Sequence, residues 1–106
     1  MSTPDKITQL QMMEHNLQQF LLQKQGFQSQ LLEIESALSE LGKTECAYKI
    51  LGNIMVKTDR GELKKDLEEK RHLVDLRIKS LEKQEGKLKE HASKTQSEVL
   101  ATLKKE

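Results

Sequence analysis

Few side chains in this sequence could carry out chemistry, and their spacing assembles no catalytic site. The three histidines, His15, His72 and His91, are scattered, with no second histidine or cysteine at ligand spacing. We interpret them as solvated helix-face residues rather than metal ligands. Cys46 has no local base to activate it as a nucleophile, so we expect a small packed residue. A glycine-rich phosphate-binding loop is also missing. The sequence therefore predicts no catalytic residue, metal site or cofactor, and a binding protein rather than an enzyme.

The composition favours long helices over a compact core or a disordered chain. Of the 106 residues, 33% are charged and only 3% are aromatic, with one proline and many Leu, Lys, Glu and Gln, which favour helices. The net charge of +1 argues against nucleic acid or a membrane surface as the partner. A single cysteine, no long apolar run and no signal-like N-terminus lead us to expect a cytoplasmic protein.

A heptad pattern predicts a first helix over about residues 4–42. Its seam residues are spaced alternately by three and four, and only Lys24 is not apolar. We expect Thr3 to cap the start, ahead of Pro4, and Gly42 to form a left-handed cap at the end. The predicted seam consists of Leu10, Met13, Leu17, Phe20, Lys24, Phe27, Leu31, Ile34, Leu38 and Leu41.

A second helix is predicted over about residues 60–103. Asp59 and Glu62 resemble a capping box at its start. The segment from Asp5 to Gly42 has two bases and five acids, whereas that from Lys57 to the C-terminus has fourteen bases and eleven acids. The opposite net charges suit the two helices as packing partners. The predicted second seam consists of Leu63, Leu67, Arg71, Val74, Ile78, Leu81, Glu85, Leu88, Ala92, Thr95 and Val99.

If the two helices fold back on each other, their seams can be aligned in one register. Leu41 then meets Leu63, and Lys24 lies one layer from Glu85. We predict that Lys24 and Glu85 pair across the seam and fix its register. The alternative is that both side chains extend outward independently.

Between the helices, residues 46–57 predict a β-hairpin around Gly52-Asn53, a two-residue turn signal. An irregular loop is the alternative. A two-strand hairpin is marginal in water, and this one is apolar on both faces with open edges. We therefore expect it to join strands of other subunits in a shared sheet or closed barrel, which makes the chain an obligate oligomer. The residues expected to drive assembly are Tyr48, Ile50, Leu51, Ile54, Met55 and Val56.

The helix ends farthest from the hairpin carry more apolar residues than the seam needs. Exposed apolar patches usually mark contact sites, and Met suits varied partners. This predicts binding at the tip, although ordinary coiled-coil core with frayed ends is the alternative. The N-terminal side offers Ile7, Leu10, Met12, Met13, Leu17, Leu21 and Leu22, and the C-terminal side offers Ala92, Val99, Leu100 and Leu103.

The stretch from Tyr48 to Lys57 resembles the YK-x-x-GN-x-x-VK hairpin of the beta-type prefoldin subunits. The run Leu81-Glu82-Lys83-Gln84-Glu85 and the glutamine-rich first helix are also similar, more to archaeal than to eukaryotic members. The resemblance covers essentially the whole chain as one domain, 1–106. The expected fold is mainly α: a long antiparallel coiled-coil hairpin with a central β-hairpin that joins an intersubunit β-barrel.

The resemblance implies a hexamer of two alpha-type and four beta-type subunits, with coiled-coil arms on a double β-barrel. It implies ATP-independent capture of unfolded polypeptides at the arm tips and delivery to a group II chaperonin. By location, the client contacts would be Ile7, Leu10, Met12, Met13, Leu17, Val99, Leu100 and Leu103. One rival hypothesis is a tethering coiled coil with a dedicated partner. Another is a nucleic-acid-binding accessory protein, against which interleaved Glu residues argue.

Overall fold

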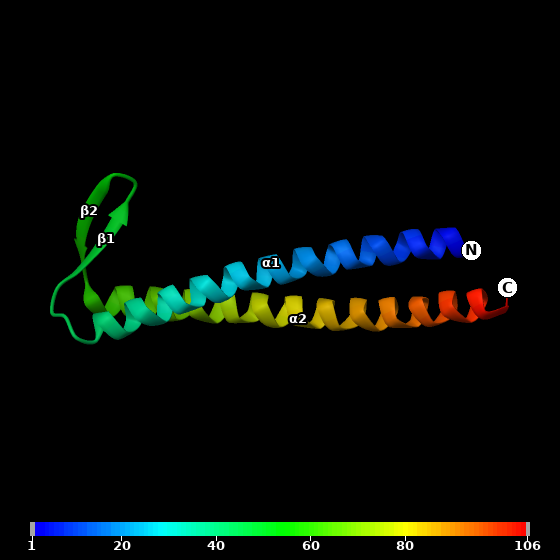
Figure 1. The fold of residues 1–106 in the computed structure, drawn as a ribbon. Coiled ribbons are helices and arrows are strands. Elements are labelled where there is room, and N and C mark those ends of the chain that lie inside the picture. Colours follow the sequence, from blue (N-terminus) through cyan, green and yellow to red (C-terminus); the bar gives the residue numbers. More distant parts are fainter. Residues whose placement is uncertain (1, 106) are drawn as a thin grey trace. The chain divides into compact units, whose positions relative to one another are not determined.

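The computed structural model describes residues 2–105, and the side chains of residues 2–104. In chain order the elements are helix α1, Thr3–Leu41; strand β1, Ala47–Leu51; strand β2, Ile54–Thr58; and helix α2, Arg60–Lys105. Two long helices with an antiparallel two-strand hairpin between them confirm the predicted fold class (Figure 1). That the whole chain behaves as one domain stays a prediction.

The start of α1 is capped one residue earlier than predicted. The backbone N–H of Asp5 donates to Ser2 Oγ at 3.4 Å, and Ser2 Oγ donates to the Asp5 carboxylate at 2.7 Å. The Lys6 N–H reaches the Ser2 carbonyl at 3.1 Å, which closes the first helical turn. Ser2 is therefore the capping residue, and the prediction that Thr3 caps the helix was wrong because Asp5, three residues after Ser2, completes a reciprocal cap.

The end of α1 also differs from the prediction. Among the described residues only Gly52 has a positive φ, so Gly42 does not form a left-handed cap. Instead the Lys43 N–H bonds to the Glu40 carbonyl at 3.0 Å in a tightened last turn. Arg60 Nη2 donates to the Gly42 carbonyl at 3.3 Å. The Lys43 bond satisfies a carbonyl of the last helical turn, as a left-handed cap would otherwise do, and the Arg60 bond satisfies the carbonyl that follows the helix.

The start of α2 shows one half of the predicted capping box, with Asp59 as the capping residue. The Glu62 N–H donates to the Asp59 carboxylate at 3.1 Å, and the Leu63 N–H donates to the Asp59 carbonyl at 3.0 Å. The acidic side chain also lies where the N–H groups of the first turn give partial positive charge.

The chain forms two compact units. The terminal unit comprises Met1–Gln25 and Lys79–Glu106, and the hairpin unit comprises Gly26–Ile78. In the terminal unit the two helical segments lie side by side and antiparallel, since Lys6 near the start of α1 pairs with Glu98 near the end of α2 at 3.2 Å (Figure 1). The most buried side chains here are those of Met13, Leu81, Thr95 and Val99.

In the hairpin unit the end of α1 and the start of α2 are likewise antiparallel. The Arg77 guanidinium lies over the Phe27 ring, 5.6 Å from its centroid, in the proposed register. All ten predicted seam residues of α1 are buried or half-buried, as are ten of the eleven in α2. The exception is Arg71, which is exposed, so its inclusion in the seam was wrong; its long charged side chain reaches water instead.

The hairpin has a two-residue turn at Gly52 and Asn53. Leu51 pairs with Ile54 next to it, and Gly52 has φ +61° while Asn53 does not have positive φ, as in a type II′ turn. The predicted hairpin is therefore confirmed, and the loop alternative is excluded. In Figure 1 its turn points away from the helices of the hairpin unit.

Successive residues of a strand point to opposite faces, so the pairing register defines two faces of the hairpin. One face carries Ala47, Lys49, Leu51, Ile54, Val56 and Thr58. We call it the helix-side face because Lys49 lines a groove together with Leu63 and Leu67 of α2. The far face carries Tyr48, Ile50, Met55 and Lys57.

Gly86 lies inside helix α2, where glycine lowers helix stability relative to alanine. A Cβ added at Gly86 in α2 would meet no atom within 4 Å. Gly86→Ala should therefore raise the free energy of unfolding by about 1 kcal/mol, through helix propensity alone. The matched control is Gly52→Ala, which forces a Cβ into the left-handed region and should lower it by roughly 1–2 kcal/mol. Urea unfolding followed by circular dichroism measures both changes. A destabilising Gly86→Ala would show that α2 requires backbone freedom there.

Candidate functional site

The side chains first considered for chemistry are all exposed. His15, His72 and His91 are exposed, and Cys46 is an exposed free thiol, so its interpretation as a packed residue was wrong. It lies between the end of α1 and β1, beyond the reach of the seam. Within residues 2–105, no three His, Cys, Asp or Glu side chains gather in a group that could hold a metal ion.

In the same range, neither helix contains an apolar stretch long enough to cross a membrane.

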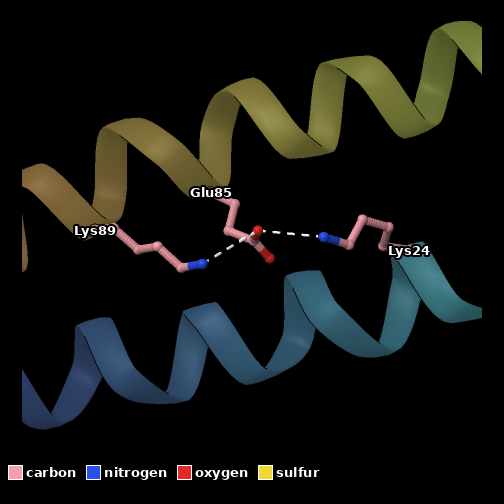
Figure 2. A network of polar contacts seen from close by, with 3 residues as sticks. All are labelled: Lys24, Glu85 and Lys89. Carbon is pink, nitrogen blue, oxygen red and sulfur yellow. Dashed lines mark hydrogen bonds and ion pairs between the residues drawn. The ribbon is translucent and has the colours of Figure 1, made fainter.

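A polar layer interrupts the seam of the terminal unit. Lys24 Nζ lies 3.2 Å from Glu85 Oε1, and Lys89 Nζ reaches the same oxygen at 3.5 Å (Figure 2). The Lys24 and Glu85 side chains are only 18% and 14% exposed, whereas Lys89 is 64% exposed. The predicted pair across the seam is therefore confirmed, and independent outward extension is excluded.

This network also changes the acidity of Glu85. The hydrogen bond from Lys24 lowers the pKa of the Glu85 carboxyl below its ordinary value of 4.5. The charges of Lys24 and Lys89 act in the same direction, and partial burial opposes them. A slip of one helix by a heptad would leave both half-buried charges without this partner, so the layer fixes the register that brings the helix ends together.

The helix ends expose several large apolar side chains. Of the eight predicted client contacts, four are exposed by 40–62% and together form what we call the tip surface: Ile7, Met12, Leu100 and Leu103. Met13 and Val99 are each 7% exposed and belong to the seam, while Leu10 and Leu17 are half-buried. The seam residues therefore pack between the two helix ends, whereas the residues of the tip surface are accessible from solvent.

The terminal unit also exposes Leu21 and Leu22, by 45% and 60%. A shallow groove on the same unit is lined by Asn16, Phe20, Gln84, Lys87, Leu88 and His91. Phe20 and Leu88 are half-buried seam residues, so the groove gives partial access to the seam. The terminal unit thus also exposes apolar side chains farther from the helix ends than the tip surface.

The hairpin exposes all six residues expected to drive assembly. Exposure ranges from 42% for Val56 to 68% for Ile50, and both faces contribute. Only Ala47, at the base, is buried, with Thr58 half-buried. A hairpin of two five-residue strands is marginally stable in water, and this one exposes much apolar surface. It is therefore the part of the chain that most needs a partner.

Three outward leucines of the hairpin unit were missed by the seam analysis. Leu32 is 66% exposed, Leu73 is 57% exposed and Leu76 is 48% exposed. The signal was available, because these leucines fall outside the alternating spacing of three and four. Their exposure shows that they do not pack against the partner helix of the coiled coil.

Comparison with known proteins agrees with this arrangement. A family model described as prefoldin subunit matches residues 4–106. The prefoldin subunit beta of Archaeoglobus fulgidus is 36% identical over 96 residues, covering 88% of this chain and 83% of the relative. That of Caldivirga maquilingensis is 34% identical, covering 92% and 83%. The crystal structure of the prefoldin beta subunit from Thermococcus strain KS-1 superimposes with a TM-score of 0.89 at 30% identity, covering 95% of this chain and 91% of that one.

The polar layer predicts a specific acid sensitivity. Because the pKa of Glu85 is lower in the folded state than in the unfolded chain, the pair stabilises the fold above about pH 4.5. That contribution is lost as the pH falls through the lowered folded pKa. The melting temperature of the wild-type chain should therefore fall toward that of Glu85→Gln between pH 7 and pH 3. A difference between the two proteins that does not change with pH would contradict the assignment.

Proposed function

Since the chain belongs to the prefoldin subunit family, which is a chaperone family, we propose that it is a beta-type subunit that holds unfolded polypeptides at its tip surface without ATP. The observation that carries the proposal is the uncovered apolar surface of the helix ends. Ile7, Met12, Leu100 and Leu103 are all exposed although the seam beside them is filled. Unfolded chains expose apolar side chains that such a surface can cover.

The tip surface suits weak and reversible binding. Burial of apolar area contributes about 25 cal/mol per Å², so one tip that buries on the order of 200 Å² yields only a few kcal/mol before the entropic cost of association. One arm therefore binds a client weakly. Several arms on one assembly raise the effective concentration of the later contacts, so a client is held by many contacts that can each release.

We further propose that the hairpin assembles the arms into a hetero-oligomer. Tyr48, Ile50 and Met55 on one face and Leu51, Ile54 and Val56 on the other would be buried between strands of neighbouring subunits. Following the family resemblance, the assembly is a hexamer of two alpha-type and four beta-type subunits around a double β-barrel. It acts in the cytoplasm and delivers its clients to a group II chaperonin.

Charging the tip surface tests client binding. The variant Met12→Glu with Leu100→Glu places two carboxylates on the tip surface while leaving the seam intact. We expect suppression of the aggregation of a denatured client to fall to background, because a carboxylate resists transfer into an apolar contact. Light scattering of a diluted, denatured client measures the effect.

The control adds the same charges elsewhere on the terminal unit. Gln18→Glu with Gln96→Glu changes two exposed polar side chains and should suppress aggregation like wild type. Full activity of the charged tip variant would rule out the tip surface as the client site. A single tight partner without aggregation suppression would favour the tethering hypothesis.

Charging the hairpin tests assembly. Ile50 and Met55 are cross-strand partners on the far face, so Ile50→Lys with Met55→Lys places like charges opposite each other in a surface that must be buried. We expect native mass spectrometry, after co-expression with an alpha-type subunit, to show the hexamer replaced by monomers. Helical circular dichroism should persist, because the seam is untouched. Intact hexamers would contradict hairpin-driven assembly.

A further inference from the structure

The shallow groove of the terminal unit has an apolar floor and a polar rim. It encloses about 450 Å³ between the two helical segments of this unit. Phe20 of α1 and Leu88 of α2 are half-buried and form the floor. The rim consists of four exposed residues, Asn16, Gln84, Lys87 and His91. An apolar surface with a few polar groups at its edge is the usual composition of a ligand site.

The rim of this groove favours negative charge. Lys87 is a cation, the His91 ring can donate an N–H, and none of the six lining residues is acidic. Lys89 is bonded to Glu85 (Figure 2), whereas within residues 2–104 no carboxylate is paired with Lys87. A ligand carboxylate at the rim would therefore meet an uncompensated cation beside an apolar surface, where a charge-assisted hydrogen bond can form.

The two amides of the rim favour an extended ligand. An amide side chain both donates and accepts hydrogen bonds, so Asn16 and Gln84 can bond to the backbone N–H and C=O groups of a peptide. A helical ligand has most of its backbone groups bonded internally and offers few of them to these amides. An extended segment of an unfolded chain offers both its backbone and its apolar side chains.

From these features we infer that the groove binds an extended segment of an unfolded client in which an apolar side chain is flanked by Asp or Glu. The apolar side chain covers Phe20 and Leu88, and the carboxylate lies at Lys87 and His91. This rests on the proposed function and deepens it, because it names the client segments that the arm selects. The four residues of the tip surface are all apolar and carry no charge preference of their own.

The expected selectivity is modest because the rim is exposed to water. One exposed ion pair changes affinity by up to about fivefold. Salt reduces this effect, since the Debye length falls from about 10 Å at 0.1 M to about 3 Å at 1 M ionic strength. The apolar contact with Phe20 and Leu88 does not depend on charge, so it persists at high salt.

Three synthetic peptides test the selectivity on the full chain, assembled with an alpha-type subunit. The peptides have equal length and the same apolar residues, which are flanked by Asp, by Asn or by Lys. At low salt we expect the Asp peptide to bind up to about fivefold more tightly than the Asn peptide, and the Lys peptide most weakly. The difference should nearly vanish at 1 M salt. Fluorescence anisotropy of labelled peptides measures the affinities.

A crosslinker and a pair of variants locate this preference. A photo-crosslinker at Gln84 should join the Asp peptide in higher yield than one at Gln18, which is exposed on α1 outside the groove. Lys87→Gln should bring the affinities for the Asp and Asn peptides close together. Lys94→Gln is the matched control, since Lys94 is an exposed lysine seven residues farther along α2 that does not line the groove. It should keep the wild-type preference.

Several results would overturn the inference. Equal binding of the three peptides at low salt would do so, as would an unchanged preference in Lys87→Gln. A crosslink from position 84 to the alpha-type subunit or to a second copy of this chain, in the absence of peptide, would assign the groove to that subunit. These results leave the proposed function in place as long as the wild-type assembly suppresses client aggregation through the tip surface. A wild-type assembly that neither binds a peptide nor suppresses aggregation would contradict both.

Discussion

The constraint on which the rest of this structure depends is the apolar hairpin that the chain cannot bury by itself. Its two strands of five residues expose large side chains on both faces, and within the strands only Ala47, at the base, is buried. The helices have no spare surface for it within the seam, because their heptad positions pack against each other. A surface of this kind in water is stabilised by association.

The helices meet a different requirement, since they must stay paired in one register over many turns. A seam of alternating apolar residues gives stability but tolerates slips by a heptad. The layer of Lys24, Glu85 and Lys89 removes that tolerance, because its charges are partly shielded from water and match in one register only. Half-buried ion pairs contribute little net stability, so the value of this one lies in specificity. The correct register places the beginning of α1 against the end of α2, and thereby forms the tip surface.

Much of this arrangement could be predicted from the sequence, because it depends on short-range patterns. The seam, the cap at Asp59, the turn at Gly52 and the Lys24–Glu85 pair follow from spacing and from the chemistry of single residues. The wrong predictions about Thr3 and Gly42 concern the helix ends, where several groups can make the capping hydrogen bonds. Ser2 rather than Thr3 caps α1 because its partner is Asp5, and Gly42 needs no left-handed cap because the N–H groups of Gly42 and Lys43 already bond to the Leu38 and Glu40 carbonyls of the last turn.

Exposure was the other quantity that the sequence could not give. Seam spacing identifies which side chains face a partner helix, yet it does not say how far each is covered. Leu10 and Met13 are both predicted seam residues, but Met13 is 7% exposed whereas Leu10 is only half-buried. Cys46 was expected to be packed because no local base could activate it and free cysteine is often buried, whereas it is exposed in the connection after α1. Leu73 and Leu76 lie outside the seam spacing, and only the structure shows that they are 57% and 48% exposed.

Hydrogen exchange of the hairpin amides as a function of protein concentration tests most directly whether the hairpin depends on neighbouring chains. If it does, the amides of Tyr48–Leu51 and Ile54–Lys57 exchange rapidly in dilute monomer and become protected as the oligomer forms, while the seam amides of α1 and α2 change much less. Strong protection of the hairpin in a stable monomer, unchanged by dilution, would contradict the account.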